Sequence, residues 1–204
     1  MTAKRGAAMQ DAANAKPGKM AAVVGLGMDA VRQALAGIRG VQIAAQNAPD
    51  QIVLSGESDA VDAAVERVRS AGSKNAVVLK TSGAWHSHLM ESAKPELRAA
   101  LEGSAIQSPS IPVISNATAG PFPSADPSAL RDLLVMQLTS PIRFVECLHR
   151  MKSLGVDAFV ELGPGKVLRG LVKKFDRGAV SCNIEDPASL DETLKTISAS
   201  GVVS

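Results

Sequence analysis

The amino-acid sequence predicts an α/β fold that contains a small β-α-β-β-α-β unit. Strand and helix patterns alternate along most of the chain, which is typical of α/β proteins. Residues 20–80 follow the β-α-β-β-α-β order of a ferredoxin-like unit. The 204 residues are 46% hydrophobic but only 2% aromatic, so we expect a core built from aliphatic side chains.

The small unit has clear element signals. Strands are expected at 20–25, 41–47, 51–56 and 75–80. A first helix is expected at 28–38, and a second helix should start at Asp59 as its N-cap and stop at Gly72. Apolar residues recur at helical spacing along the second helix: Val61, Ala64, Val65 and Val68.

Strand and helix patterns also alternate along the rest of the chain. Helices are expected at 1–15, 87–101, 126–138, 141–153, 166–176 and 187–199. Strands are expected at 111–115, 157–162 and 179–181, of which the second is predicted to be buried. Since no strand precedes the helix at 1–15, the α/β part is expected to begin in the middle of its fold.

Composition excludes several classes of protein. No apolar run approaches the roughly 18–20 residues of a membrane-spanning helix, and the first residues lack a signal-peptide pattern. A net charge of +2 with few aromatics does not indicate a nucleic-acid partner. Cys147 and Cys182 lack C-x-x-C spacing, which argues against structural zinc and suits a reducing cytosol. We therefore expect a cytoplasmic protein with no metal, no nucleic acid and no membrane contact.

The segment from Gly83 to Met90 carries the sharpest chemical signal. His86 follows a predicted strand and precedes a predicted helix, and histidine is well suited to moving protons near neutral pH. On spacing alone, a surface or helix-capping histidine explains His86 and His88 better than catalysis does. The H-x-H spacing lacks a third ligand type, so no metal is expected there.

A histidine base needs a nucleophile. The G-x-S-x-G turn that presents a catalytic serine is absent from the 204 residues. The nearest match, residues 55–58, lacks the second glycine at the right spacing and lies inside the small unit. Neither cysteine has the sequence context of a nucleophile.

Five motifs occur in order and together are specific. They are Arg5-Gly6-x-x-Met9-Gln10, Asn47-x-Pro49-x-Gln51-x-Val53-x-Ser55-Gly56, Trp85-His86-Ser87-x-Leu89-Met90, Gln137-Leu138-x-x-Pro141-Ile142 and Glu161-Leu162-Gly163-Pro164-Gly165-Lys166-Val167-Leu168. Over nearly the whole chain, the sequence resembles the malonyl-CoA:acyl-carrier-protein transacylase family of fatty-acid synthesis. The resemblance implies a partial α/β-hydrolase-like large subdomain, residues 1–18 and 81–204, with an inserted ferredoxin-like small subdomain, residues 19–80.

The resemblance also assigns chemistry. His86 matches the catalytic base, which takes the proton of a serine and later activates the phosphopantetheine thiol of acyl-carrier protein. Its other ring nitrogen is expected to donate to the main-chain carbonyl of Gln137. Arg5 matches the arginine that binds the free carboxylate of malonyl-CoA, the substrate, and a planar guanidinium suits a carboxylate. No cofactor is implied.

Further substrate-binding residues follow from the same resemblance. Trp85 stands where a bulky aromatic favours malonyl over methylmalonyl, a steric filter worth about 1–3 kcal/mol. Met9 is expected beside the Arg5 pocket, and Asn47 and Gln51 are expected to line the cleft facing the small subdomain.

The helix expected at 166–176 separates two faces. Its apolar stripe comprises Val167, Leu168, Leu171, Val172 and Phe175. Another side carries Lys166, Arg169, Lys173 and Arg177. This side is either a docking surface for an acidic acyl-carrier protein or a solvated basic face, and the sequence leaves both open. The turn at 163–165 is not a G-x-G-x-x-G fingerprint.

In the family, the G-H-S-x-G nucleophile and an oxyanion-hole glutamine belong to a segment upstream of the part that this sequence matches. We therefore expect a missing N-terminal segment to supply the serine, and the isolated chain not to transfer malonyl groups. Three alternatives follow: a piece of a transacylase, one half of a split enzyme, or a non-catalytic module that binds carrier protein.

Overall fold

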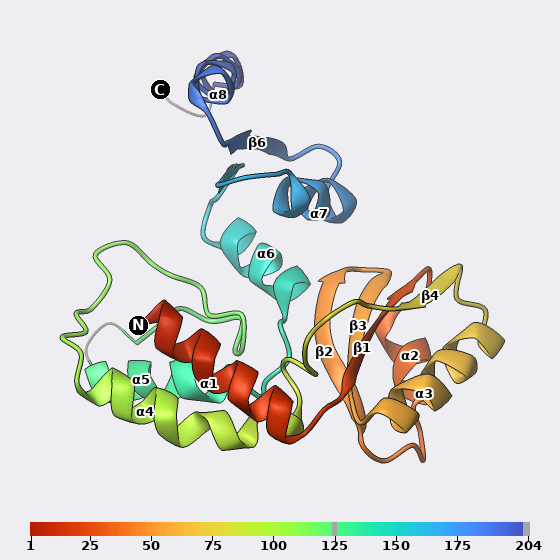
Figure 1. Ribbon diagram of the computed structural model, residues 1–204. Coiled ribbons are helices and arrows are strands. Elements are labelled where there is room, and N and C mark those ends of the chain that lie inside the picture. The colour runs from red at the N-terminus through yellow and green to blue at the C-terminus, as the bar shows by residue number, and fades with distance from the viewer. Residues whose placement is uncertain (124–125, 202–204) are drawn as a thin grey trace. The chain divides into compact units, whose positions relative to one another are not determined.

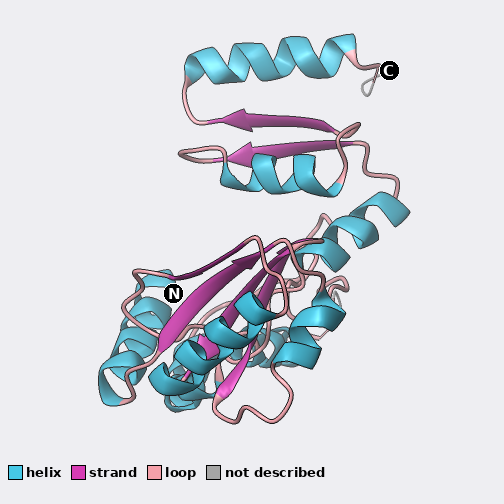
Figure 2. Cartoon of the chain, turned by 90° about the vertical axis from the view of Figure 1, so that its right-hand side faces the viewer, coloured by secondary structure: helices cyan, strands magenta, loops and turns pink. Residues whose placement is uncertain are grey.

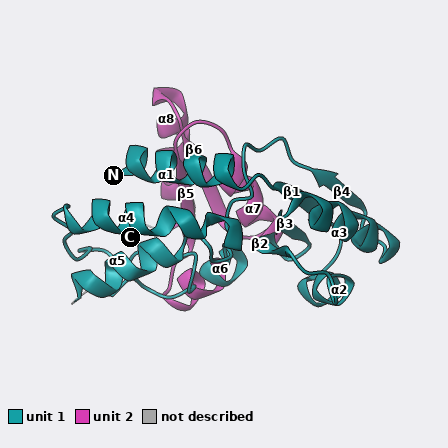
Figure 3. Ribbon diagram, turned by 60° about the horizontal axis from the view of Figure 1, so that its bottom comes forward, with its two compact units in different colours: residues 1–147 teal, residues 148–204 magenta. Residues whose placement is uncertain are grey.

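A computed structural model of the chain describes residues 1–123 and 126–201. The chain divides into two compact units, residues 1–147 and 148–204 (Figure 3). The first unit contains a four-stranded sheet and a group of helices, and the second contains a two-stranded sheet. The resemblance predicts a different division, with residues 19–80 as the small subdomain and residues 1–18 and 81–204 as the large one. That division stays a prediction.

The four-stranded sheet is antiparallel and has the strand order β2-β3-β1-β4. Its strands are β1 (Lys19–Val24), β2 (Val41–Ala48), β3 (Gln51–Gly56) and β4 (Asn75–Val78). Helices α2 (Met28–Ala34) and α3 (Ser58–Ser70) lie on one face of it (Figure 1). The predicted ferredoxin-like order is therefore confirmed.

Strand alternation gives this sheet two apolar faces. Val23, Ile52 and Leu54 are fully buried against the apolar sides of α2 and α3. The opposite face carries Met20, Ala44, Ala45 and Val53. At one end of the sheet, a Cβ on Gly56 would lie 2.0 Å from the carbonyl oxygen of Gly40, so only glycine permits this approach.

Four helical segments form the second core of the first unit. They are α1 (Thr2–Ala15), the 3-10 helix η1 (His88–Ala93), α4 (Lys94–Glu102) and α5 (Pro127–Met136) (Figure 1). Ala8 and Ala12 of α1 are buried with Leu97 and Leu101 of α4 and with Leu138. Small alanine side chains let α1 approach its neighbours closely.

The segment after α5 pairs with the free edge of β2. Ile142 donates its amide to the carbonyl of Ala44 and accepts from the amide of Gln46, both at 2.8 Å. Because residues 141–143 are extended in this pairing, the helix expected at 141 instead begins at Phe144, as α6 (Phe144–Ser153).

The second unit contains the parallel strands β5 (Ala158–Leu162) and β6 (Val180–Ile184). Helices α7 (Val167–Phe175) and α8 (Pro187–Ala199) lie on opposite faces of this pair (Figure 2). The prediction that β5 is buried is wrong here: Val160 is 38% exposed and Leu162 77%. Within the described chain β5 pairs with β6 alone, which leaves its other edge uncovered.

Four other expectations differ in detail. The first helix of the small unit ends at Ala34 instead of 38, and the second takes Glu57, not Asp59, as its N-cap. The helix expected at 87–101 is split into η1 and α4, with Pro95 in the first turn of α4. No strand forms at 111–115, where Ile114 makes only an isolated bridge to Pro121, since Pro112 lacks an amide proton for a ladder.

Among the helices of residues 1–123 and 126–201, none is both long and apolar enough to cross a membrane.

Candidate active site

His86 lies in the loop between β4 and η1, with a left-handed backbone at φ +57°. Such a conformation costs a non-glycine residue roughly 1–3 kcal/mol, so its surroundings have to hold it. The adjacent Ser87 is fully buried; its hydroxyl donates to the carbonyl of Ala84 at 2.6 Å and accepts from the amide of Leu89 at 3.2 Å. Ser87 thus caps η1 and fixes the loop directly after His86.

The imidazole of His86 has a defined hydrogen-bond partner. Its Nδ1 lies 3.1 Å from the carbonyl oxygen of Gln137, the contact expected from the sequence. A carbonyl only accepts, so we assign the proton to Nδ1, which leaves the lone pair of Nε2 available. Burial lowers the pKa of His86; the carbonyls of Gln137 and Ser140 oppose this, and the positive charge of Arg5 adds to it. The ring is therefore neutral near pH 7 and can accept a proton.

Arg5, on α1, contacts the side chain of Gln137. Its Nη2 donates to the side-chain oxygen of Gln137 at 2.6 Å. Burial lowers the pKa of Arg5, but a guanidinium keeps its proton at neutral pH. Gln137, at the C-terminal end of α5, thus contacts His86 through its carbonyl and Arg5 through its amide side chain.

A cavity of about 280 Å³ opens beside Arg5 and Gln137. Its other lining residues include Leu97, Leu101 and Phe122. The pocket is mostly apolar with one guanidinium, which could bind a carboxylate, and neither His86 nor Trp85 is among its lining residues.

No described residue supplies a nucleophile next to His86. Within residues 1–123 and 126–201, the ring has no hydroxyl or thiol hydrogen-bond partner. Both Cys147 and Cys182 are buried, and burial raises the pKa of the Cys147 thiol, which disfavours a thiolate. These residues also contain no group of three or more His, Cys, Asp or Glu side chains that could hold a metal ion.

His88, the other histidine of the motif, is a surface residue. Its Nε2 lies 3.6 Å from a carboxylate oxygen of Glu57, and its side chain is 45% exposed. Of the two histidines, only His86 combines burial, a fixed tautomer and a neighbouring cation.

The other expected substrate-binding residues occupy different environments. Trp85 is half-buried and packs against the helical core and against the sheet face that carries Met20 and Val53. Met9 is 7% exposed and belongs to the helical core. Asn47 is half-buried near the end of β2.

One residue that the sequence analysis did not single out contacts the His86 loop directly. The side chain of Gln42, on β2, bonds to the main chain of His86, His88 and Thr139. No motif marks Gln42, and a glutamine in a strand gives no signal of such a contact.

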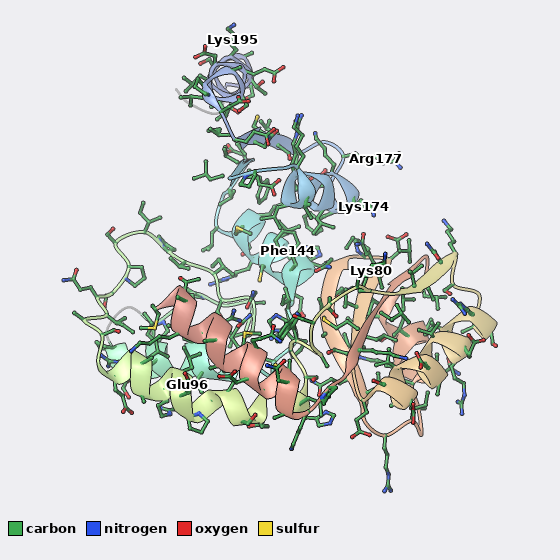
Figure 4. The ribbon with its side chains drawn as sticks, in the orientation of Figure 1. Lys80, Glu96, Phe144, Lys174, Arg177 and Lys195 are labelled. Carbon is green, nitrogen blue, oxygen red and sulfur yellow. The ribbon has the colours of Figure 1, made fainter. Side chains whose placement is uncertain are left out.

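The basic residues expected to bind carrier protein lie in the second unit. Arg169 donates to the side-chain oxygen of Asn183 at 3.2 Å, and Lys173 donates to the carbonyl of Ala179 at 2.7 Å. Lys166 is exposed, and Arg177 projects from the turn after α7 (Figure 4). Two of the four side chains therefore bind β6 or the turn before it, and two extend into solvent.

The expected apolar stripe of α7 is only partly buried. Leu171 and Val172 are buried, whereas Val167 is 71% and Leu168 47% exposed. Phe175 packs edge-on against His149, with ring centroids 4.7 Å apart.

The fold and this histidine–arginine arrangement define an acyl transferase domain. The family of that description matches residues 1–185, and the chain belongs to it. Among its relatives is the malonyl CoA-acyl carrier protein transacylase of Bacillus subtilis, which is 37% identical over 198 residues. That alignment covers 95% of this chain but 62% of the relative, so the chain spans about three-fifths of the relative's length.

Solved structures of transacylases have the same fold over most of this chain. The malonyl CoA-acyl carrier protein transacylase of Clostridium perfringens superimposes with a TM-score of 0.91 at 33% identity, over 98% of this chain and 63% of that one. A type II PKS acyl-carrier protein in complex with its malonyl-transacylase gives a TM-score of 0.87 at 32% identity, over 94% and 62%. These likenesses confirm the fold class, a partial α/β-hydrolase-like large subdomain with a ferredoxin-like small one.

Proposed function

We propose that this chain provides the base and the carboxylate-binding arginine for malonyl transfer from malonyl-CoA to the phosphopantetheine thiol of acyl-carrier protein. His86 is the base and Arg5 binds the malonyl carboxylate. The serine nucleophile comes from a polypeptide segment outside these 204 residues. Family membership and the names of the relatives support the chemistry.

One observation carries the proposal: Gln137 contacts both functional side chains. Its carbonyl accepts from Nδ1 of His86 at 3.1 Å, and its side chain accepts from Arg5 at 2.6 Å. A base of fixed tautomer next to a half-buried cation suits the transfer of an acyl group that ends in a carboxylate.

The reaction follows from these contacts. Nε2 of His86 accepts the serine proton as the serine oxygen attacks the thioester carbonyl, and the resulting imidazolium returns that proton to the leaving thiolate of coenzyme A. In the second half, Nε2 takes the proton of the phosphopantetheine thiol, whose sulfur attacks the serine ester. The imidazolium then protonates the departing serine oxygen, which restores both groups. The carbonyl of Gln137 orients the ring but stabilises the imidazolium less than a carboxylate would.

Further roles belong to the same proposal. Trp85 restricts the acyl pocket against an α-methyl branch, Met9 supports the Arg5 pocket from the core, and Asn47 contributes to the cleft. Residues 19–80 are the small subdomain, and residues 1–18 with 81–204 belong to the large one. A cytoplasmic location remains the expectation from cysteine usage.

Docking of acyl-carrier protein is proposed at the basic residues of the second unit, Lys166, Arg169, Lys173 and Arg177. Positive charge there would attract an acidic carrier and raise the association rate.

The proposal is tested by mixing the chain with malonyl-CoA and acyl-carrier protein, with and without a polypeptide that carries the G-H-S-x-G segment of an acyl transferase. We expect malonyl transfer only when that segment is present. The matched control replaces the serine of the added segment by alanine and should be inactive.

Two results would count against it. Robust turnover by the chain alone would show that the nucleophile lies within it. Binding of acyl-carrier protein without turnover in any mixture would favour a non-catalytic module.

A further inference from the structure

Gln42 on β2 bonds to two chain segments that lie far from it in the sequence. Its Nε2 donates to the carbonyl of His86 at 3.1 Å and to the carbonyl of Thr139 at 3.3 Å. Its Oε1 accepts from the amide of His88 at 3.1 Å. We propose that Gln42 is a positioning residue of the active site, which joins the His86 loop to the turn at 137–140 and so sets the contact between His86 and Gln137.

On the loop side, Gln42 holds the backbone of the strained residue itself. His86 has φ +57°, and a left-handed non-glycine residue persists only where its neighbours fix it. Gln42 forms hydrogen bonds to the peptide groups on both sides of Ser87, since it donates to the carbonyl of His86 and accepts from the amide of His88. This fixes the direction in which the His86 side chain leaves the loop.

On the turn side, Gln42 binds the chain between the two carbonyls that the ring faces. Thr139 lies between Gln137 and Ser140, whose carbonyls both interact with the imidazole of His86. The side-chain amide of Gln42 therefore holds the main chain from which the His86 side chain extends. It also holds the turn whose carbonyls interact with the His86 ring. Both protons of an amide are available for this, and the structure uses them on the two carbonyls.

The fold does not depend on Gln42. The pairing of Ile142 with β2 anchors the same turn through main-chain hydrogen bonds to Ala44 and Gln46. Replacing Gln42 should therefore loosen the turn and the loop locally while the sheet stays intact. A shift of the imidazole by about 1 Å can slow such a reaction by roughly 100-fold, so local loosening is enough to affect proton transfer.

The test measures the tautomer of His86 by long-range ¹H–¹⁵N NMR of the chain labelled with ¹⁵N-histidine. The measurement is made at a pH above the pKa of His86. In the unmodified protein we expect the Nδ1–H form. Gln42→Met keeps the size of the side chain and removes all three hydrogen bonds, so the ring should shift toward Nε2–H, the form an unconstrained imidazole prefers. Gln42→Glu keeps the acceptor for His88 but loses both donors, and it should shift the tautomer in the same direction.

Activity is the second readout and rests on the proposed function. With the serine-bearing segment added, Gln42→Met should lower kcat roughly tenfold while the KM for malonyl-CoA changes less than about twofold. Gln33→Met, the same replacement on the exposed side of α2, is the control and should change neither quantity. Circular-dichroism melting identifies a variant that fails to fold, and Gln42→Glu then replaces it.

The two proposals fail in different ways. An unchanged Nδ1–H tautomer in both Gln42 variants, with normal transfer, would overturn the role of Gln42 and leave the proposed function standing. A tautomer shift in variants of a chain that never transfers malonyl would support the role of Gln42 and count against the proposed function.

Discussion

Nδ1 of His86 lies 3.1 Å from the carbonyl oxygen of Gln137, a residue 51 positions further along the chain. The side chain of Gln137 in turn accepts from Arg5, so one residue at the end of α5 organises the base and the cation. If Gln137 moves, both groups move. Transfer activity is that of the chain combined with the polypeptide that carries the G-H-S-x-G segment.

Replacing the base should abolish transfer. His86→Ala removes the proton acceptor, and we expect kcat to fall by roughly 10³-fold or more, measured as malonyl loading of acyl-carrier protein. His88→Ala is the matched control, because the His88 side chain is exposed, its Nε2 lies near the carboxylate of Glu57, and the substitution keeps the main-chain amide that donates to Gln42. Equal losses in the two variants would remove the case for His86.

Arg5→Ala should damage malonyl transfer far more than acetyl transfer. Hydrogen bonds to a charged partner contribute about 1.5–3 kcal/mol each, so kcat/KM for malonyl-CoA should fall roughly 10- to 100-fold. Acetyl-CoA has no free carboxylate, and its rate should change only slightly. Arg5→Lys keeps a point charge and should be intermediate. The same loss with both substrates would contradict carboxylate binding.

The pH profile should report the depressed pKa of His86. Burial lowers this pKa, and the charge of Arg5 adds to the effect. The neutral base then persists to lower pH, so the acid limb of kcat/KM should lie below about 6.5, the ordinary histidine value. Arg5→Gln removes the positive charge, which raises the pKa and should move the acid limb to higher pH. Acetyl-CoA is the substrate for this measurement, and movement of the limb to lower pH would refute the coupling.

Gly83→Ala should destabilise the chain itself. An added Cβ would lie 2.6 Å from Cβ of Ala13 and 2.8 Å from Cη2 of Trp85. Overpacking of this kind costs about 1–3 kcal/mol, which denaturant unfolding can detect. The control is Gly6→Ala on α1, where nothing lies within 4 Å of the new Cβ; it should leave stability unchanged or raise it by up to about 1 kcal/mol. Equal stabilities of the two variants would contradict the packing around Trp85.

Charge reversal should weaken carrier-protein docking in the second unit. Arg177→Glu and Lys166→Glu are the clean probes, since Arg169 and Lys173 also form internal hydrogen bonds. We expect kcat/KM for acyl-carrier protein to fall roughly 3- to 10-fold at low salt, and the difference should shrink as salt screens the charges. Lys195→Glu on α8 (Figure 4) is the control. An equal effect at Lys195 would point to net charge instead of a local surface.

The sequence by itself determined the order of most helices and strands, and the family resemblance proposed His86 and Arg5 as the residues of greatest chemical interest. Period-two and helical spacing encode strands and helices locally, so the β-α-β-β-α-β order was readable from residues 20–80. His86, Arg5 and the carbonyl of Gln137 were readable because motif resemblance carries information about distant contacts that periodicity lacks. The predicted start of α6 was wrong because Ile142 pairs with β2 and the chain is extended there. Such pairing depends on a distant segment, so the local sequence does not reveal it.

Only the tertiary structure decided how these groups hold one another. The hydrogen bond from Arg5 to Gln137 joins residues 132 positions apart, and Gln42 reaches Thr139 across 97. Likewise, the exposure of Val160 and Leu162 depends on what lies beside β5, which a run of apolar residues does not specify. A side chain's partner is fixed by distances between separate segments, and those distances exist only once the chain has folded.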